Sequence, residues 1–271
     1  MGISLETCRH GVQRTVLKAL CAATGGRATD RSAAPPTAEA MYRARVLGGP
    51  LRGRTLTMPG LERLSYALGT YEGHVVRTIR RHVRPGSIAY DVGANAGYLT
   101  LVMALCVGRE GKVFAFEPDP RNTAALEENL TRNSLAQVRT VAQAVSSESG
   151  VVEFATFEYT LVGHIATGDT PADARLVRVP AVSLDDFVYG GGNPAPHFLK
   201  IDVEGAEDSV LLGSQRVLAE ARPSLLVEVR MEGSCDTVPR LLQARGYRQV
   251  PVESGPRVES EGFADVLFVP A

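Results

Sequence analysis

The chain has 271 residues, 44% of them hydrophobic, and its 30 acidic and 29 basic side chains leave a net charge of −1. This length supports one sizeable core, and the balanced charge argues against a surface for nucleic acid or another polyanion. The four cysteines include no Cys-x-x-Cys pair, which disfavours a disulfide framework or a zinc site. No run of 18 apolar residues occurs, so we expect a cytoplasmic protein with no membrane contact.

Residues 1–60 predict an extension that precedes a main domain at 61–271. Residues 9–24 have the periodicity of an amphipathic helix, which is a candidate arm for a homodimer. Residues 45–47 and 54–58 flank a Gly-Gly-Pro turn and predict a small hairpin.

From residue 87 onward, strand and helix patterns alternate, which favours an α/β fold with a mostly parallel sheet and helices on both faces. No helix follows the last strand, so we expect that strand to pair antiparallel with a neighbour. The predicted strands are 87–90, 112–117, 138–142, 151–156, 176–182, 197–201, 225–229 and 264–269, and the predicted helices are 61–68, 73–82, 98–105, 122–133, 184–187, 206–212 and 236–245.

Residues 90–98 read Tyr-Asp-Val-Gly-Ala-Asn-Ala-Gly-Tyr. A short strand ends at Asp91, Gly93 permits a tight turn, Gly97 permits close approach of ligand or backbone, and an apolar helix starts at Tyr98. A strand, a glycine turn and a helix N-terminus together form a nucleotide-binding corner. The third glycine of a dinucleotide fingerprint is missing, which argues against a nicotinamide oxidoreductase. The acid at Asp91 suits an amino group, such as that of S-adenosylmethionine.

The next strand ends in Glu117, before Pro118 and about 20 residues past the glycines. A carboxylate at this position is expected to accept hydrogen bonds from both ribose hydroxyls of a nucleotide.

Ligands of open α/β sheets lie beyond the carboxyl ends of the strands, where Asn95 and residues 144–146 also fall. Residues 199–207, Leu-Lys-Ile-Asp-Val-Glu-Gly-Ala-Glu, run from a buried strand into acids. If the chain stays extended, Asp202 and Glu204 share one face. They could hold an amino group, act as a general base or bind a cation such as Mg²⁺. Because no third ligand is evident, a divalent cation stays possible but we assign no metal ligands.

These segments resemble the FkbM family of S-adenosylmethionine-dependent methyltransferases. The similarity extends from about residue 47 to the C-terminus, and the block at 199–207 is its most specific part. Arg230 departs from the pattern, because many relatives have a histidine there. The matching segments are 68–72, 91–97, 116–118, 126–130, 144–146, 199–207 and Glu228.

The resemblance implies a Rossmann-like class I methyltransferase fold, with seven strands and an antiparallel last strand. It also implies O-methylation of a small-molecule hydroxyl, often on a sugar or polyketide. Glu72 either folds over the cofactor or only caps its helix. The candidate cofactor-binding residues are Glu72, Asp91, Gly93, Asn95, Gly97, Glu117, Pro118, Ala144 and Asp202.

A hydroxyl acceptor needs a base, because an alcohol is a poor nucleophile. Asp202 and Glu204 are the first candidates, and His164, in a polar insertion over 158–173, is the second. The alternative is a methyltransferase acting on nitrogen or on RNA or protein. The sequence shows neither an Asn-Pro-Pro-Tyr-like motif in the place it requires nor a basic stripe with aromatics.

Overall fold

In the computed structural model of the protein, the described residues are 41–59, 64–156, 163–166, 170, 174–230, 237–252 and 263–271. The predicted helix over 9–24, and with it the hypothesis of a dimer arm, lies outside them. Among the described residues, no helix has the length and apolar character that crossing a membrane requires.

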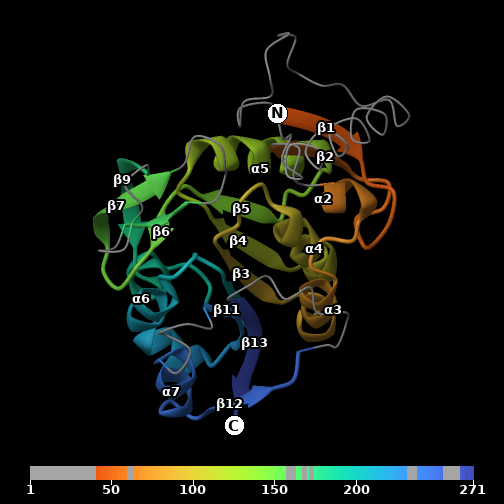
Figure 1. Cartoon of the computed structure of the whole chain (residues 1–271). Helices are drawn as coiled ribbons and strands as arrows, with labels where there is room; N and C mark the ends of the chain where they lie inside the picture. Colours follow the sequence, from red (N-terminus) through yellow and green to blue (C-terminus); the bar gives the residue numbers. More distant parts are fainter. Residues whose placement is uncertain are drawn as a thin grey trace, which may run out of the picture.

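A seven-stranded sheet forms the centre of the fold (Figure 1). Its order is β12-β13-β11-β10-β3-β4-β5. The strands from β11 to β5 pair in parallel, and β13 runs antiparallel to both β11 and β12, which confirms the predicted architecture. The strands are β3 (Ile88–Val92), β4 (Lys112–Phe116), β5 (Val138–Val141), β10 (Phe198–Ile201), β11 (Ser224–Arg230), β12 (Tyr247–Val250) and β13 (Phe263–Pro270).

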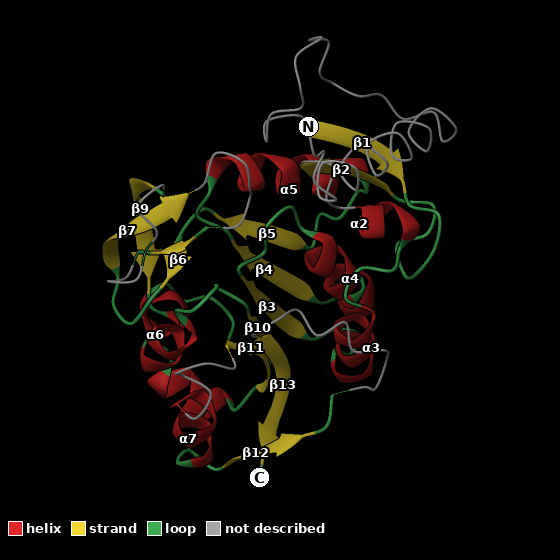
Figure 2. Cartoon of the chain, in the orientation of Figure 1, coloured by secondary structure: helices red, strands yellow, loops and turns green. Residues whose placement is uncertain are grey.

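Helices cover both faces of this sheet (Figure 2). Strand side chains alternate between the faces, so Ala89 packs in one hydrophobic cluster and Tyr90 in the other. On the first face lie α2 (Leu64–Leu68), α3 (Gly73–His82), α4 (Tyr98–Val107) and α5 (Pro120–Arg132). On the second lie α6 (Glu207–Leu212), α7 (Thr237–Gln243) and two π-helical turns, η1 (Asp186–Gly190) and η2 (Val217–Ala221).

The order of the strands fixes where a ligand can bind. From β3 the chain builds outward through β4 to β5, and it later returns to place β10 on the other side of β3. The connections therefore leave β3 and β10 in opposite directions and open a crevice at their carboxyl ends. Such a switch point is where ligands bind in open α/β sheets.

An N-terminal hairpin of β1 (Met41–Arg45) and β2 (Thr55–Pro59) packs on α5. The buried Asn129 amide accepts a hydrogen bond from Thr57 N, and it donates to Thr57 O and Ala96 O, both at 2.9 Å. One side chain thus ties the hairpin to the glycine loop. The predicted first strand at 45–47 was placed too late, because residues 46–54 form the turn between β1 and β2.

A second sheet, in the order β6-β9-β7-β8, stands beside the main one (Figure 1). We predicted strands 151–156 and 176–182 as part of the alternating α/β pattern, but they form a separate antiparallel ladder. No helix was predicted between them, and an antiparallel pair needs no helical crossover. The strands are β6 (Ala144–Val145), β7 (Gly150–Thr156), β8 (His164–Ile165) and β9 (Arg175–Val182).

We expect Asn129→Ala to lower the free energy of unfolding by about 3 kcal/mol or more, because each buried polar group left without a partner costs about 1–3 kcal/mol. Denaturant titration measures this change. Glu127→Ala, at an exposed position on the same helix, is the matched control and should stay within about 0.5 kcal/mol of the parent. A loss below about 1 kcal/mol in Asn129→Ala would show that the hairpin is held by other contacts.

Candidate functional site

Two glycines with left-handed backbones build the loop after β3. Gly93 has φ +80°, and a Cβ there would lie 1.8 Å from the Asp202 carbonyl oxygen. Gly97, the N-cap of α4, has φ +91°, and a Cβ added there would lie 2.4 Å from the Leu126 side chain. The close backbone approach that we assigned to Gly97 therefore occurs at Gly93. Gly97 instead allows α4 and α5 to pack closely.

A cavity of about 240 Å³ lies at the carboxyl ends of β3, β4 and β10. Asp91 and Gly97 are not part of its wall. The predicted cofactor-binding residues that line it are Glu72, Gly93, Asn95, Glu117, Pro118, Ala144 and Asp202. It is also lined by residues to which the sequence assigned no role, among them Tyr66, Tyr71, Tyr98, Gln143, Lys200 and Glu228.

Lys200, on β10, is a buried cation beneath the cavity floor with an exposed fraction of only 5%. Its Nζ lies 3.0 Å from Asp202 Oδ2 and 3.4 Å from Asp91 Oδ1, and it donates to the Gly93 carbonyl at 3.1 Å. Burial alone would lower the pKa of this ammonium, but the charges of Asp202 and Asp91 raise it above its ordinary value. Lys200 thus stays charged and joins the two central strands.

Asp91 is fully buried on β3 and faces Lys200 and α4 rather than the cavity. Its Oδ2 accepts a hydrogen bond from Thr100 Oγ1 at 2.6 Å. Burial raises the pKa of this carboxyl, and Lys200 counteracts part of the rise. Asp91 does not line the cavity. Its Oδ1 lies 3.4 Å from the Lys200 ammonium but accepts no hydrogen bond from the described residues.

Glu117 directly follows β4, and its carboxylate contacts the glycine loop after β3. Its two oxygens accept backbone hydrogen bonds from Asn95 N and Asp119 N, each at 2.8 Å. Burial raises its pKa to about 7, even though these two backbone hydrogen bonds act in the opposite direction. Each carboxylate oxygen can accept a second hydrogen bond, so Glu117 can still take the ribose hydroxyls for which we predicted it.

Glu72 lies at the N-cap of α3 with a left-handed φ of 42°, but its side chain makes no capping hydrogen bond. Its carboxylate lines the cavity instead. Burial, and then the charge of Asp202, raises its pKa to about 7. An ion pair between His74 Nε2 and Asp265 Oδ2, at 2.6 Å, fixes this end of the helix to β13. Of the two roles that the sequence left open, capping is excluded.

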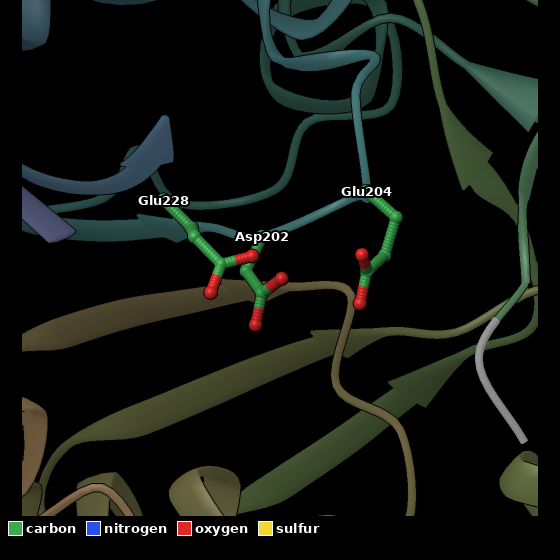
Figure 3. A group of neighbouring side chains, drawn as sticks. All are labelled: Asp202, Glu204 and Glu228. Atoms are coloured by element: carbon green, nitrogen blue, oxygen red, sulfur yellow. The ribbon is translucent and has the colours of Figure 1, made fainter. Parts of the chain in front are cut away.

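Asp202, Glu204 and Glu228 converge on one space (Figure 3). The expectation of an extended chain was wrong, because β10 ends at Ile201 and Glu204 adopts a left-handed φ of 58°. The turn nevertheless directs both acids into the cavity. Glu228 reaches it from β11, and burial followed by the charges of Asp202 and Glu204 raises its pKa to about 10.

One carboxylate oxygen from each of these three acids lies within 4.8 Å of the others, and in the described part of the chain they form the group that could hold a metal ion. Hard carboxylate oxygens suit Mg²⁺. The same spacing also suits a shared proton, since close carboxylates cannot all ionise. Glu228 is the third carboxylate; the sequence included it in the family resemblance but assigned it no role.

His164 does not line the cavity, although its neighbours Gly163 and Ile165 do. Successive side chains of a strand point to opposite faces, and β8 turns His164 away. Glu207 is structural: its Oε1 accepts hydrogen bonds from Val203 N and Gly205 N and so holds the acidic loop.

The strand order, the glycine loop and the two acids that follow the central strands define a Rossmann-like methyltransferase that depends on S-adenosylmethionine. Residues 91–249 match the Methyltransferase FkbM domain, and the chain belongs to this family.

Three curated relatives are similar to the chain. Hexuronic acid methyltransferase AglP of Haloferax volcanii is 29% identical, over 63% of this chain and 67% of its own. The 31-O-demethyl-FK506 methyltransferase FkbM of Streptomyces tacrolimicus is 30% identical, over 62% and 75%. The 2-O-methyltransferase NoeI of Sinorhizobium fredii is 28% identical, over 51% and 62%.

We expect Lys200→Met to lower the free energy of unfolding by about 3–5 kcal/mol, because it leaves Asp91 and Asp202 buried without their cation. The loss should be larger at pH 8 than at pH 5. The folded variant then holds protons that the unfolded chain has released, so its stability falls as the pH rises. Denaturant titration at both pH values measures this, with the exposed Lys112→Met as control. Equal losses in the two variants would contradict the role of Lys200.

Proposed function

We propose that this methyltransferase transfers a methyl group from S-adenosylmethionine to a hydroxyl of a small molecule of the sugar or polyketide type. The observation that carries the proposal is the group of three carboxylates beside the nucleotide-binding corner. The acceptors named for the relatives, a hexuronic acid and 31-O-demethyl-FK506, support this class of substrate.

The residues around the cavity fit the cofactor. Glu117 would accept the ribose hydroxyls, with Asn95 and Pro118 beside it, and Ala144 would border the adenine. When bound, the cofactor supplies a methyl group that is already activated by its sulfonium. The protein therefore has to align the acceptor and remove one proton, and alignment alone accounts for about 7–11 kcal/mol in the best intramolecular reactions.

The carboxylates would handle the proton of the acceptor hydroxyl. Lys200 holds Asp202 at 3.0 Å, so its position is fixed. Glu204 approaches the same space from the following turn. We propose that Asp202 or Glu204 receives the proton, and that Glu228, whose pKa of about 10 keeps it protonated near neutral pH, shares its proton with Asp202. A divalent cation held by the same three acids is the alternative way to lower the pKa of the acceptor hydroxyl.

Calorimetric titration tests the cofactor assignment. We expect micromolar binding of S-adenosylmethionine and S-adenosylhomocysteine, and no binding of NAD, because the glycine loop lacks the third glycine of a dinucleotide site. Glu117→Gln should weaken both sulfur ligands, since an amide oxygen is a poorer acceptor for two hydroxyls. Binding of NAD, or of neither sulfur ligand by folded protein, would refute the assignment.

For the chemical step, we expect Asp202→Asn and Glu204→Gln to bind S-adenosylmethionine, and at least one of them to lose about 10²–10⁴-fold in turnover with a hydroxylated acceptor. Asp208→Asn, in the first turn of α6 and outside the cavity wall, is the matched control. Wild-type turnover in both variants would remove the two acids from the reaction.

The same assay separates proton transfer from a cation role. If a cation takes part, EDTA removes the activity and Mg²⁺ restores it. If the three acids serve only as a base, turnover is the same before and after EDTA treatment.

A further inference from the structure

Three tyrosines gather around Glu72 at one end of the cavity, and all three line it. The rings of Tyr66 and Tyr98 stack with centroids 4.8 Å apart, and Tyr71 meets them edge-on at 4.3 and 5.2 Å. Tyr71 also makes a side-chain hydrogen bond with Glu72. The cluster joins α2, the turn before α3 and the first residue of α4, so it is a rigid wall.

The Tyr98 hydroxyl is the unexplained part of this wall. The residue is 2% exposed, and within the described structure its oxygen has no hydrogen-bond partner. Burial, and then the neighbouring Tyr66 and Glu72, raises its pKa to about 12, so the hydroxyl stays protonated. The Tyr98 ring packs edge-on against Tyr71, which makes the hydrogen bond with Glu72. A buried hydroxyl without a partner costs free energy, and such a donor in a cavity wall is explained by a ligand that accepts from it.

The backbone conformation and the buried carboxylate of Glu72 also point to a ligand. It keeps a left-handed φ of 42° without gaining a capping hydrogen bond, and strain of this kind persists where function requires it. Its carboxylate is buried and has the charge of Asp202 nearby, an arrangement that a cation would relieve. Asp91, the other acid near the glycine loop, is already neutralised by Lys200.

We infer that Glu72 and Tyr98 recognise the amino-acid end of the cofactor: Glu72 accepts from the α-ammonium, and the Tyr98 hydroxyl donates to the α-carboxylate. An acid and a neutral donor side by side match the two opposite charges of an amino acid. The inference rests on the proposed cofactor and places this contact at Glu72, which lines the cavity, rather than at Asp91, which does not.

The test compares two ligands that differ in this end alone. S-adenosylhomocysteine carries the amino-acid end, and 5′-methylthioadenosine lacks it. We expect Tyr98→Phe to weaken binding of S-adenosylhomocysteine about tenfold or more, as for loss of a hydrogen bond to a charged group, and to change binding of methylthioadenosine less than twofold. Glu72→Gln should show the same selectivity.

Controls distinguish this result from a general defect. Tyr247→Phe removes a hydroxyl that donates to Leu218 O outside the cavity, and it should bind both ligands as the parent does. The melting temperature of ligand-free Tyr98→Phe should be unchanged or higher, because the deleted oxygen has no partner.

Unchanged affinity of Tyr98→Phe for S-adenosylhomocysteine, or an equal loss for both ligands, would overturn the inference while leaving the cofactor assignment intact. Failure of the parent protein to bind either ligand would instead overturn the cofactor assignment itself, and the inference with it.

Discussion

The ion pair of Lys200 with Asp91 and Asp202 is the interaction on which the rest of the site depends. Asp91 and Lys200 lie on the two strands that flank the switch point, and Asp202 directly follows β10. The ammonium also donates a hydrogen bond to the carbonyl of Gly93. A charge buried this deeply is tolerated only when its partners are well placed. The positions of β3, β10 and the glycine loop are therefore set by one another, and the cavity floor cannot shift without separating these charges.

Above that floor, acidic side chains are in excess. Burial raises the pKa values of Glu72, Glu117 and Glu228, and the charge of Asp202 raises those of Glu72 and Glu228 further. A methyl donor with a sulfonium and an ammonium group enters such a site with favourable electrostatics, and its neutral product leaves with one positive charge fewer. The charge that assists binding of the donor thus also assists release of the product.

The sequence predicted the main sheet, the glycine corner and the role of Glu117 as an acid that faces the cavity, because each depends on local pattern and spacing. It contained Lys200 and Glu228 in the family resemblance but assigned neither a role. Both lie within strands. The alternation of side chains along a strand does not show which polar side chain is buried, or which residue of the neighbouring strand it contacts. Glu204 was placed correctly for the wrong reason, since its left-handed turn depends on contacts with β3 and α6. His164 does not line the cavity, because one residue of strand register decides which face of a sheet a side chain takes.

The small sheet of β6 to β9 has a consequence for how this protein can diversify. Phe154 and Ile165 of this sheet form part of the cavity wall, and its own small hydrophobic cluster holds it together. Its central ladder, β7 with β9, makes no strand pairing with the seven-stranded sheet. Side chains on this wall can therefore be exchanged, or the hairpin lengthened, without disturbing the charged floor. We therefore expect selectivity for the methyl acceptor to be separable from binding of the cofactor, so that the two can evolve or be engineered at different rates.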